Sequence, residues 1–154
     1  MKKVKFAVVG AGHIGKRHAE MVTRNENAEL VALVDIKSAD TLGIDKYGVP
    51  FFNSIDELIA IGPDFDVLCI ATPNGLHAQH AMAGLTARKH IVVEKPMALT
   101  KAGCEQIIFK ALQKHKQVFC VMQNRYSPPS VWLKEVLVSG KLGKVFMVQI
   151  NCYW

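Results

Sequence analysis

Short apolar runs alternate along the chain with segments whose apolar residues recur at helical spacing. The apolar runs predict strands within residues 3–10, 28–35, 47–54, 65–73, 90–96 and 117–123. The intervening segments predict helices within residues 13–24, 54–62, 74–89 and 100–116. The runs are continuously apolar, which is typical of strands covered by helices on both faces. This repeated order predicts an α/β fold with a doubly wound parallel sheet.

Capping signals support two of the predicted helices. Ser54 precedes Glu57 by three residues, and this spacing forms a capping box, with Gly62 as the stop. Thr100 precedes a helical segment that ends in basic residues, which complement the helix dipole. These signals fix where the helices begin more firmly than periodicity alone does.

The pattern changes after Gln123, so residues 1–123 are predicted to form one domain. Residues 124–143 read as a loop and a helix entered at Pro128, and residues 144–154 read as one long strand. An apolar last strand without a partner is an aggregation hazard. We therefore expect residues 124–154 to be the linker helix and first strand of a truncated α+β domain. The alternative is a short protein whose last strand pairs with the first sheet or with a second copy.

Composition and charge narrow the class of protein. Half of the 154 residues are hydrophobic and 21% are charged, as in globular domains, and no apolar run is long enough to cross a membrane. The net charge is +6, but the basic residues are scattered, which argues against nucleic acid and suits a small polyanion. Cys69 and Cys120 lie in apolar runs, and no CxxC pair occurs, so we expect core thiols and a reducing, cytoplasmic location.

A glycine-rich turn joins the first predicted strand to the first helix. Gly10, Gly12 and Gly15 have GxGxxG spacing, and Asp35 follows twenty residues after the last of them. This context is the dinucleotide fingerprint of a Rossmann domain, because the glycines allow a tight turn, a close pyrophosphate and close helix packing. His13 and Ile14 open the helix whose N-terminus would face the diphosphate.

Asp35 ends the second predicted strand, and Ile36 follows it. A carboxylate there can accept hydrogen bonds from the adenosine ribose and repels a 2′-phosphate, so NAD is expected over NADP. The alternative is a solvated acid at a strand end. Lys37 and Ser38 lie close enough to soften the exclusion of NADP.

Two further strand ends carry polar residues. The residues that follow the fourth predicted strand and are candidates for cofactor binding are Ala71, Thr72, Pro73, Asn74 and His77. We expect the first three near the cofactor's adenosine or nicotinamide ribose, Asn74 as a helix cap and His77 in the first turn of that helix. His77 and His80 share helical spacing, but no further ligand cluster accompanies them, so no metal site is predicted.

The fifth predicted strand stops at Glu94, Lys95 and Pro96, and the sixth stops near Asn124 and Arg125. A cation at such a strand end can stabilise negative charge that develops on the oxygen of a bound substrate. The alternative for Lys95 is an ordinary surface lysine. Asn124 and Arg125 are candidates for cofactor or substrate contact, or for a linker role.

Four segments, GAGHIGKRH, ATPNGLH, VVEKPMALT and MQNRY, together with the closing GKLGKVFMVQINCYW, resemble the glucose–fructose oxidoreductase, inositol dehydrogenase and rhizopine-catabolism (Gfo/Idh/MocA) family. The resemblance implies that Lys95 contacts the substrate hydroxyl and the cofactor as the catalytic lysine, while Glu94 orients it or binds the nicotinamide ribose. It also implies that a second domain supplies the substrate pocket and the general base.

The same resemblance implies an NAD-dependent oxidoreductase that acts on a secondary hydroxyl of a sugar, an inositol or a nucleotide sugar. The closing segment resembles members that act on UDP-N-acetyl-aminosugar uronates. The full-length enzyme would be a homo-oligomer. The alternative is a non-catalytic NAD-binding sensor or scaffold that keeps the fold.

Overall fold

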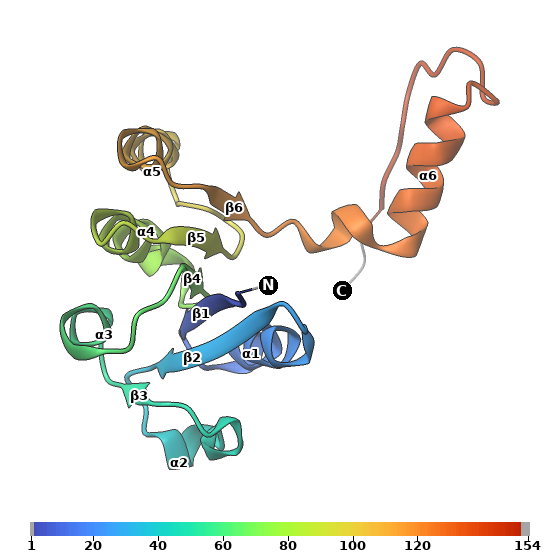
Figure 1. The fold of residues 1–154 in the computed structure, drawn as a ribbon. Coiled ribbons are helices and arrows are strands. Elements are labelled where there is room, and N and C mark those ends of the chain that lie inside the picture. The colour runs from blue at the N-terminus through green and yellow to red at the C-terminus, as the bar shows by residue number, and fades with distance from the viewer. Residues whose placement is uncertain (1, 152–154) are drawn as a thin grey trace. The chain divides into compact units, whose positions relative to one another are not determined.

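A computed structural model describes residues 2–151. Six parallel strands form one sheet in the order β3-β2-β1-β4-β5-β6 (Figure 1). The strands are β1 (Val4–Val9), β2 (Ala28–Val34), β3 (Phe51–Phe52), β4 (Val67–Ile70), β5 (His90–Val93) and β6 (Val118–Cys120). The predicted doubly wound α/β fold is confirmed.

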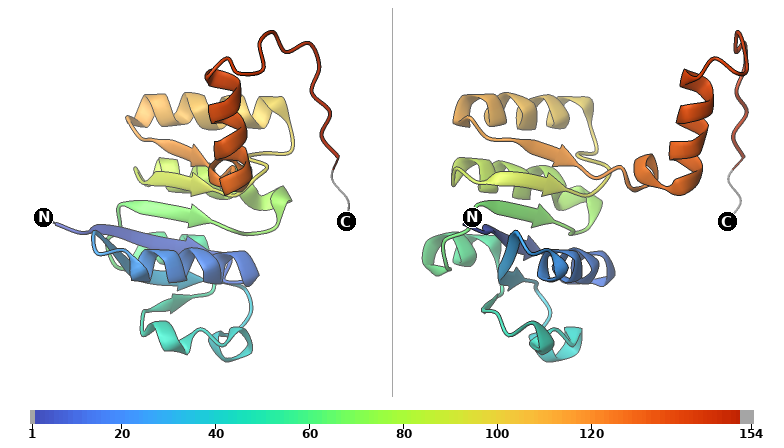
Figure 2. Two further views of the ribbon diagram at one scale, coloured as in Figure 1. Left: turned by 90° about the vertical axis from the view of Figure 1, so that its right-hand side faces the viewer. Right: turned by 45° about the vertical axis from the view of Figure 1, so that its right-hand side comes forward.

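Helices cover both faces of this sheet, as Figure 2 shows for residues up to the end of β6. The helical elements are α1 (His13–Arg24), α2 (Ala39–Leu42), η1 (Asp45–Tyr47), α3 (Ile55–Ile61), η2 (Asn74–Leu76), α4 (His77–Thr86), α5 (Lys101–Lys114), η3 (Gln123–Tyr126) and α6 (Pro128–Val138). Residues of α3, α4 and α5 belong to one buried cluster, and residues of α1 and α2 belong to another. The sheet therefore separates two hydrophobic cores.

The continuous apolar strands are explained by this arrangement. Successive side chains of a strand point to opposite faces. In β1, Ala7 and Val9 join the cluster under α3, α4 and α5, whereas Val8 joins the cluster under α1 and α2. In β4, Leu68 and Cys69 divide in the same way. Because both faces are buried, every position in the strand centre must be apolar.

The predicted caps form as expected. The Ser54 hydroxyl accepts the Glu57 N–H at 3.1 Å, and the Thr100 hydroxyl accepts the Gly103 N–H at 3.1 Å. The Glu57 carboxylate reaches back to accept the Asn53 N–H at 2.9 Å. Each bond satisfies a donor that the first turn of a helix or its approach would otherwise leave unpaired.

The strand order reverses between β1 and β4. The chain runs from β1 outward through β2 and β3, then returns to β4 beside β1 and runs outward through β5 and β6. The connections on the two sides of this point therefore lie on opposite faces of the sheet. A doubly wound sheet binds ligands at the carboxyl ends of its strands at such a point.

The edge strand differs from the centre of the sheet. Cys69, in β4, is buried as expected, but Cys120, in β6, is exposed. The expectation of a core thiol at Cys120 is wrong, because β6 has a neighbouring strand on one side only.

Residues from Met122 onward form a second compact unit with η3 and α6. The predicted strand over residues 144–154 does not form in its described part, since residues 144–151 contain no strand. A strand needs a hydrogen-bonded neighbour, and these residues have none among those described. Residues 152–154 lie outside the described part of the chain. The assignment of this unit to an α+β domain stays a prediction.

None of the helices in residues 2–151 combines the length and the apolar character that a membrane crossing requires.

Candidate functional site

The glycine turn between β1 and α1 is packed against the end of β4. Gly10 has a φ of +85°, and a Cβ on it would lie 2.7 Å from the backbone of Ala71 and Thr72. A Cβ on Gly15 would overlap the carbonyl oxygen of Gly10. Gly12 is different, because a Cβ there would meet no atom within 4 Å. Two of the three glycines are therefore required by the fold, and the third faces open space.

The N-terminus of α1 has neither a side-chain cap nor an acidic residue in its first turn. Gly12 is its N-cap residue. The side chains of His13 and Ile14 are exposed beside it. The amides of a first helical turn lack partners within the helix, and they carry the positive end of the dipole. This end of α1 is therefore suited to an anionic group.

Asp35 braces the glycine turn from the end of β2. Its Oδ2 accepts the Ala11 N–H at 2.8 Å, and its Oδ1 accepts the Lys37 N–H at 2.9 Å. Each carboxylate oxygen has further lone pairs, so the group can still accept hydrogen bonds from a ligand. Ile36 is 91% exposed directly beside it. The sequence identified the acid but not its bond to the turn.

The end of β4 is a turn that leads into α4. The Ala71 N–H donates to Val9 at 2.8 Å, which ties this turn to β1. Thr72 Oγ1 shares a hydrogen bond of 3.1 Å with His80 Nδ1. Pro73 and Asn74 are exposed, and Asn74 begins η2 without capping α4. The cap predicted at Asn74 is wrong, because a 3-10 turn precedes the helix.

His77 is the most deeply buried polar side chain of this turn, with 1% of its surface exposed. Its Nδ1 lies 2.7 Å from the carbonyl oxygen of Pro96, and its Nε2 lies 2.7 Å from that of Thr72. A carbonyl oxygen only accepts, so both contacts are hydrogen bonds when both ring nitrogens carry a hydrogen. His77 thus connects the ends of β4 and β5.

His80 is a half-buried neighbour of His77. Burial lowers the pKa of His80, and the nearby His77 lowers that pKa further. His80 is therefore expected to be neutral beside Thr72 at pH 7.

Glu94 and Lys95 follow β5. His18, from α1, donates through Nε2 to Glu94 Oε1 at 2.9 Å. The other oxygen, Oε2, accepts the Lys95 N–H at 3.3 Å. The Lys95 side chain is exposed and has no ion pair in the part of the chain that the structure describes. Sequence reasoning missed His18, although it closes the GAGHIGKRH segment, because no spacing links it to a residue 76 positions away.

These contacts connect neighbouring strand ends along the carboxyl edge of the sheet. Ala11 donates to Asp35, Gly10 packs against Ala71, and two histidines contact the residues on either side of Lys95. The structure thereby brings together the predicted residues at the ends of β1, β2, β4 and β5. Asn124 and Arg125 lie on η3 in the second unit, and the structure does not place them relative to this edge.

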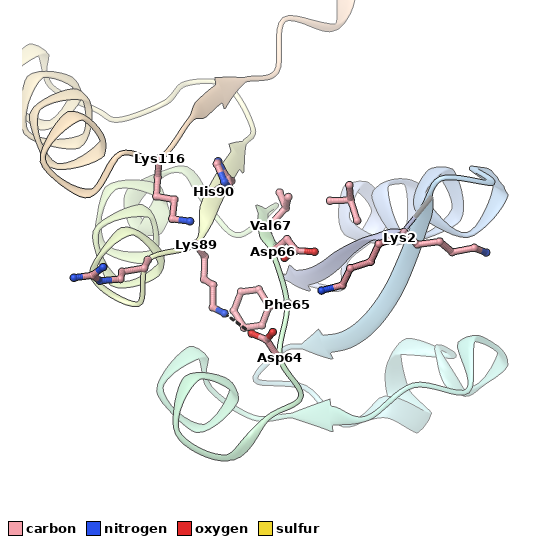
Figure 3. Close-up of a pocket in the computed structure, with 11 residues that line it drawn as sticks. Lys2, Asp64, Phe65, Asp66, Val67, Lys89, His90 and Lys116 are labelled. Atoms are coloured by element: carbon pink, nitrogen blue, oxygen red, sulfur yellow. Dashed lines mark hydrogen bonds and ion pairs between the residues drawn. The ribbon is translucent and has the colours of Figure 1, made fainter.

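A hollow of about 440 Å³ lies at the other edge, around the amino ends of the strands (Figure 3). Lys89 Nζ lies 2.8 Å from Asp64 Oδ1 and 4.6 Å from the centre of the Phe65 ring. Arg88 and Lys116 follow the ends of α4 and α5. Basic residues at these positions complement helix dipoles, which explains them without a ligand. The hollow contains none of the predicted site residues.

Among residues 2–151, no group of three or more His, Cys, Asp and Glu side chains is arranged to hold a metal ion.

Comparison with known proteins identifies the family of this domain. Residues 4–122 match the family model GFO_IDH_MocA, described as an oxidoreductase family with an NAD-binding Rossmann fold. An inositol 2-dehydrogenase of Salmonella paratyphi B is 34% identical over 156 residues, covering 97% of this chain and 46% of that protein. A glucose-6-phosphate 3-dehydrogenase of Bacillus subtilis is 32% identical over 150 residues, covering 96% of this chain and 41% of that protein.

A solved structure shows the same architecture with ligands. The WlbA dehydrogenase of Bordetella pertussis, in complex with NADH and UDP-GlcNAcA, superimposes with a TM-score of 0.87 and 29% identity, covering 94% of this chain and 45% of that one. The chain thus spans less than half the length of each of these relatives. The resemblance inferred from the four sequence motifs is confirmed, and the chain belongs to the Gfo/Idh/MocA oxidoreductase family with an NAD-binding Rossmann fold.

Proposed function

We propose that this chain is the cofactor-binding part of an NAD-dependent dehydrogenase that acts on a secondary hydroxyl of a sugar, an inositol or a nucleotide sugar. The observation that carries the proposal is the continuous carboxyl edge of the sheet. It has an uncapped helix N-terminus at one end and a lysine without an ion pair among the described residues at the other. An anion-binding group and a cation for the reacting hydroxyl are thus held on one rigid frame.

The residues of this edge fit the parts of NAD. The N-terminus of α1, with Gly12 open to the outside, suits the pyrophosphate. Asp35 suits the adenosine ribose and disfavours a 2′-phosphate, and the exposed Ile36 offers an apolar surface for the adenine ring. His13, Ile14 and the turn from Ala71 to Asn74 form the walls. We propose NAD as the cofactor in preference to NADP.

Lys95 is the proposed catalytic residue. When bound, NAD would supply the hydride acceptor, so that loss of a hydride from the carbinol carbon and of the hydroxyl proton to a base would give a carbonyl group. The ammonium group of Lys95 stabilises the negative charge that develops on the oxygen. Its exposed position and lack of an ion pair within residues 2–151 leave it available for this contact. The base itself, together with the substrate pocket, belongs to the second domain implied by the family resemblance.

The names of the relatives support the substrate class. An inositol 2-dehydrogenase and a glucose-6-phosphate 3-dehydrogenase both act on ring alcohols, and the WlbA structure contains UDP-GlcNAcA. A UDP-N-acetyl-aminosugar uronate is the finer proposal within that class. We also propose a homo-oligomeric enzyme, on the family resemblance, and a reducing cytoplasmic location, which the free thiols of Cys69, Cys104 and Cys120 support.

The function is tested with Lys95→Ala in the longest natural form of the protein, which is the form that would carry the second domain implied by the family resemblance. A panel of inositols and nucleotide sugars serves as substrates. We expect kcat to fall about 100-fold or more while the Kd for NADH changes by about twofold at most. Lys101→Ala is the matched control, because Lys101 forms only an exposed pair with Glu105 at 3.5 Å. Equal losses of kcat and NADH affinity would make Lys95 a binding residue. NADH binding without turnover on any substrate would favour a sensor or scaffold.

A further inference from the structure

Two histidines contact the residues on either side of Lys95, and they come from different helices. His18, in α1, binds the side chain of Glu94, and His77, at the start of α4, lies against the carbonyl group of Pro96. Lys95 itself is exposed between these two held residues. The arrangement joins one helix from each face of the sheet to the same three-residue segment.

The contact of His18 is shielded from water. The side chains of His18 and Glu94 are 20% and 16% exposed, so the hydrogen bond competes less with solvent than a surface pair does. The carboxylate has a second task, because its Oε2 accepts the backbone N–H of Lys95 at 3.3 Å. Fixing the Glu94 carboxylate therefore also fixes the peptide that leads into Lys95.

His77 contacts the residue that follows Lys95. Its Nδ1 lies 2.7 Å from the carbonyl oxygen of Pro96, and its Nε2 lies 2.7 Å from the carbonyl oxygen of Thr72. The ring therefore links the segment after Lys95 to the end of β4. Both partners are carbonyl acceptors, so the ring donates to them through a nitrogen that carries a hydrogen. His80 Nδ1 lies 3.1 Å from Oγ1 of the same Thr72, so a second histidine contacts this turn.

A lysine side chain has four rotatable bonds and cannot be aimed unless its backbone is fixed. We propose that His18 and His77 are positioning residues that hold the backbone on both sides of Lys95, so that its ammonium group is presented to the substrate hydroxyl. This inference rests on the proposed function for the role of Lys95. The contacts by which the histidines act can be measured without turnover.

The first experiment follows the backbone amide resonance of Lys95 by NMR in this 154-residue chain. His18→Ala should shift it, because the Glu94 carboxylate that accepts this N–H loses its orientation. His18→Gln should restore it, since the glutamine amide can donate from near the position of Nε2. His115→Asn is the control, because His115 is exposed at the end of α5 and asparagine tolerates its φ of 52°. An unmoved resonance in His18→Ala, or no restoration by glutamine, would overturn the role of His18.

The second experiment needs no variant, so a folding defect cannot obscure it. ¹⁵N NMR of the His77 ring should show a directly bonded hydrogen on Nδ1, the nitrogen that lies 2.7 Å from the carbonyl oxygen of Pro96. A bare Nδ1 could not donate to that oxygen and would overturn the role of His77.

The third experiment adds kinetics in the longest natural form. His18→Ala should lower kcat about tenfold to 100-fold and leave the Kd for NADH within about twofold, with recovery in His18→Gln. A loss confined to NADH binding would overturn the positioning role. If the unaltered enzyme turned over no sugar, inositol or nucleotide sugar, the proposed function would fail, and the two NMR experiments would still decide the histidine contacts.

Discussion

The two edges of the parallel sheet use polar residues in different ways. At the carboxyl edge, the side chains of Asp35, His18 and His77 bind backbone or side-chain groups of neighbouring turns and fix their geometry. What distinguishes this edge is His77, a polar side chain with 1% of its surface exposed that links two strand ends.

The amino edge also has bonds between elements, because Asp66 Oδ2 accepts the Lys5 N–H at 2.9 Å and His90 Nδ1 accepts the Gln117 N–H at 3.1 Å. Beside them lie basic residues at helix ends and a Lys89–Asp64 pair with an 80% exposed aspartate. The concentration of charge at the amino edge is therefore a poorer guide to the site than a buried polar side chain that links two strand ends.

Of the substitutions that test this comparison, we expect the largest effect on stability at the glycine turn of the carboxyl edge. Gly15→Ala should destabilise the domain by about 3 kcal/mol, because the new Cβ overlaps the Gly10 carbonyl oxygen and the turn cannot move away from Ala71. Gly12→Ala is the matched control, since it meets no atom within 4 Å and should melt near the unaltered protein. Thermal unfolding followed by circular dichroism measures both. Equal melting temperatures for the two variants would contradict the packing described for this edge.

Gly12→Ala should nevertheless weaken NADH binding, because the added methyl group occupies the space in front of the α1 N-terminus. A variant that keeps its stability and its NADH affinity would show that the pyrophosphate does not approach Gly12.

A smaller effect is expected at Asp35. Asp35→Ala should lower NADH affinity about tenfold, equal to about 1.4 kcal/mol, because ribose hydroxyls lose their acceptor. NADPH affinity should fall less, since the charge that repels the 2′-phosphate is also removed. Calorimetric titration with both nucleotides gives the ratio. The Ala11 N–H also loses its partner, so Asp35→Asn, which keeps an acceptor oxygen, separates that structural loss from the loss of charge.

The smallest effect is expected at the amino edge. The hydrogen bond and charge of Lys89 lower the pKa of Asp64, so the pair would favour folding above the ordinary aspartate pKa and lose that contribution as the pH falls. Asp64 is largely solvated, which screens the pair. Asp64→Asn should therefore leave the melting temperature at pH 7 and the Kd for NADH nearly unchanged. A loss of NADH affinity there would show that the two edges are not independent.

Much of the fold could be predicted because local patterns determined it. Apolar runs gave the strands, and Ser54 and Thr100 marked helix starts through bonds to residues three positions away. The glycine turn could be predicted in part for the same reason, since Gly15 meets Gly10 within six residues, but the packing of Gly10 on Ala71 joins distant parts of the chain. The position of Asp35 at a strand end followed from the alternation of elements.

The rest depends on contacts between distant residues. His18 and Glu94 are 76 positions apart, so no local pattern predicts their hydrogen bond. The burial of His77 follows from the meeting of β4 and β5, whereas its spacing from His80 indicated only a solvated or hydrogen-bonding histidine. The strand expected over residues 144–154 failed in its described part because an apolar pattern specifies a strand only where a partner strand is available.

Helix α1 sets a length scale across the proposed site. Its N-cap, Gly12, lies where the diphosphate is expected, and His18, six residues later, touches the acid beside the proposed catalytic lysine. At about 1.5 Å per residue, the helix separates these two points by about 9 Å along its axis. The helix therefore sets a fixed distance between the proposed sites of the diphosphate and of the reactive nicotinamide end of the dinucleotide. An insertion or deletion between Gly12 and His18 would change the spacing and also rotate His18 away from Glu94, so this stretch should tolerate substitutions of exposed residues but no change in length.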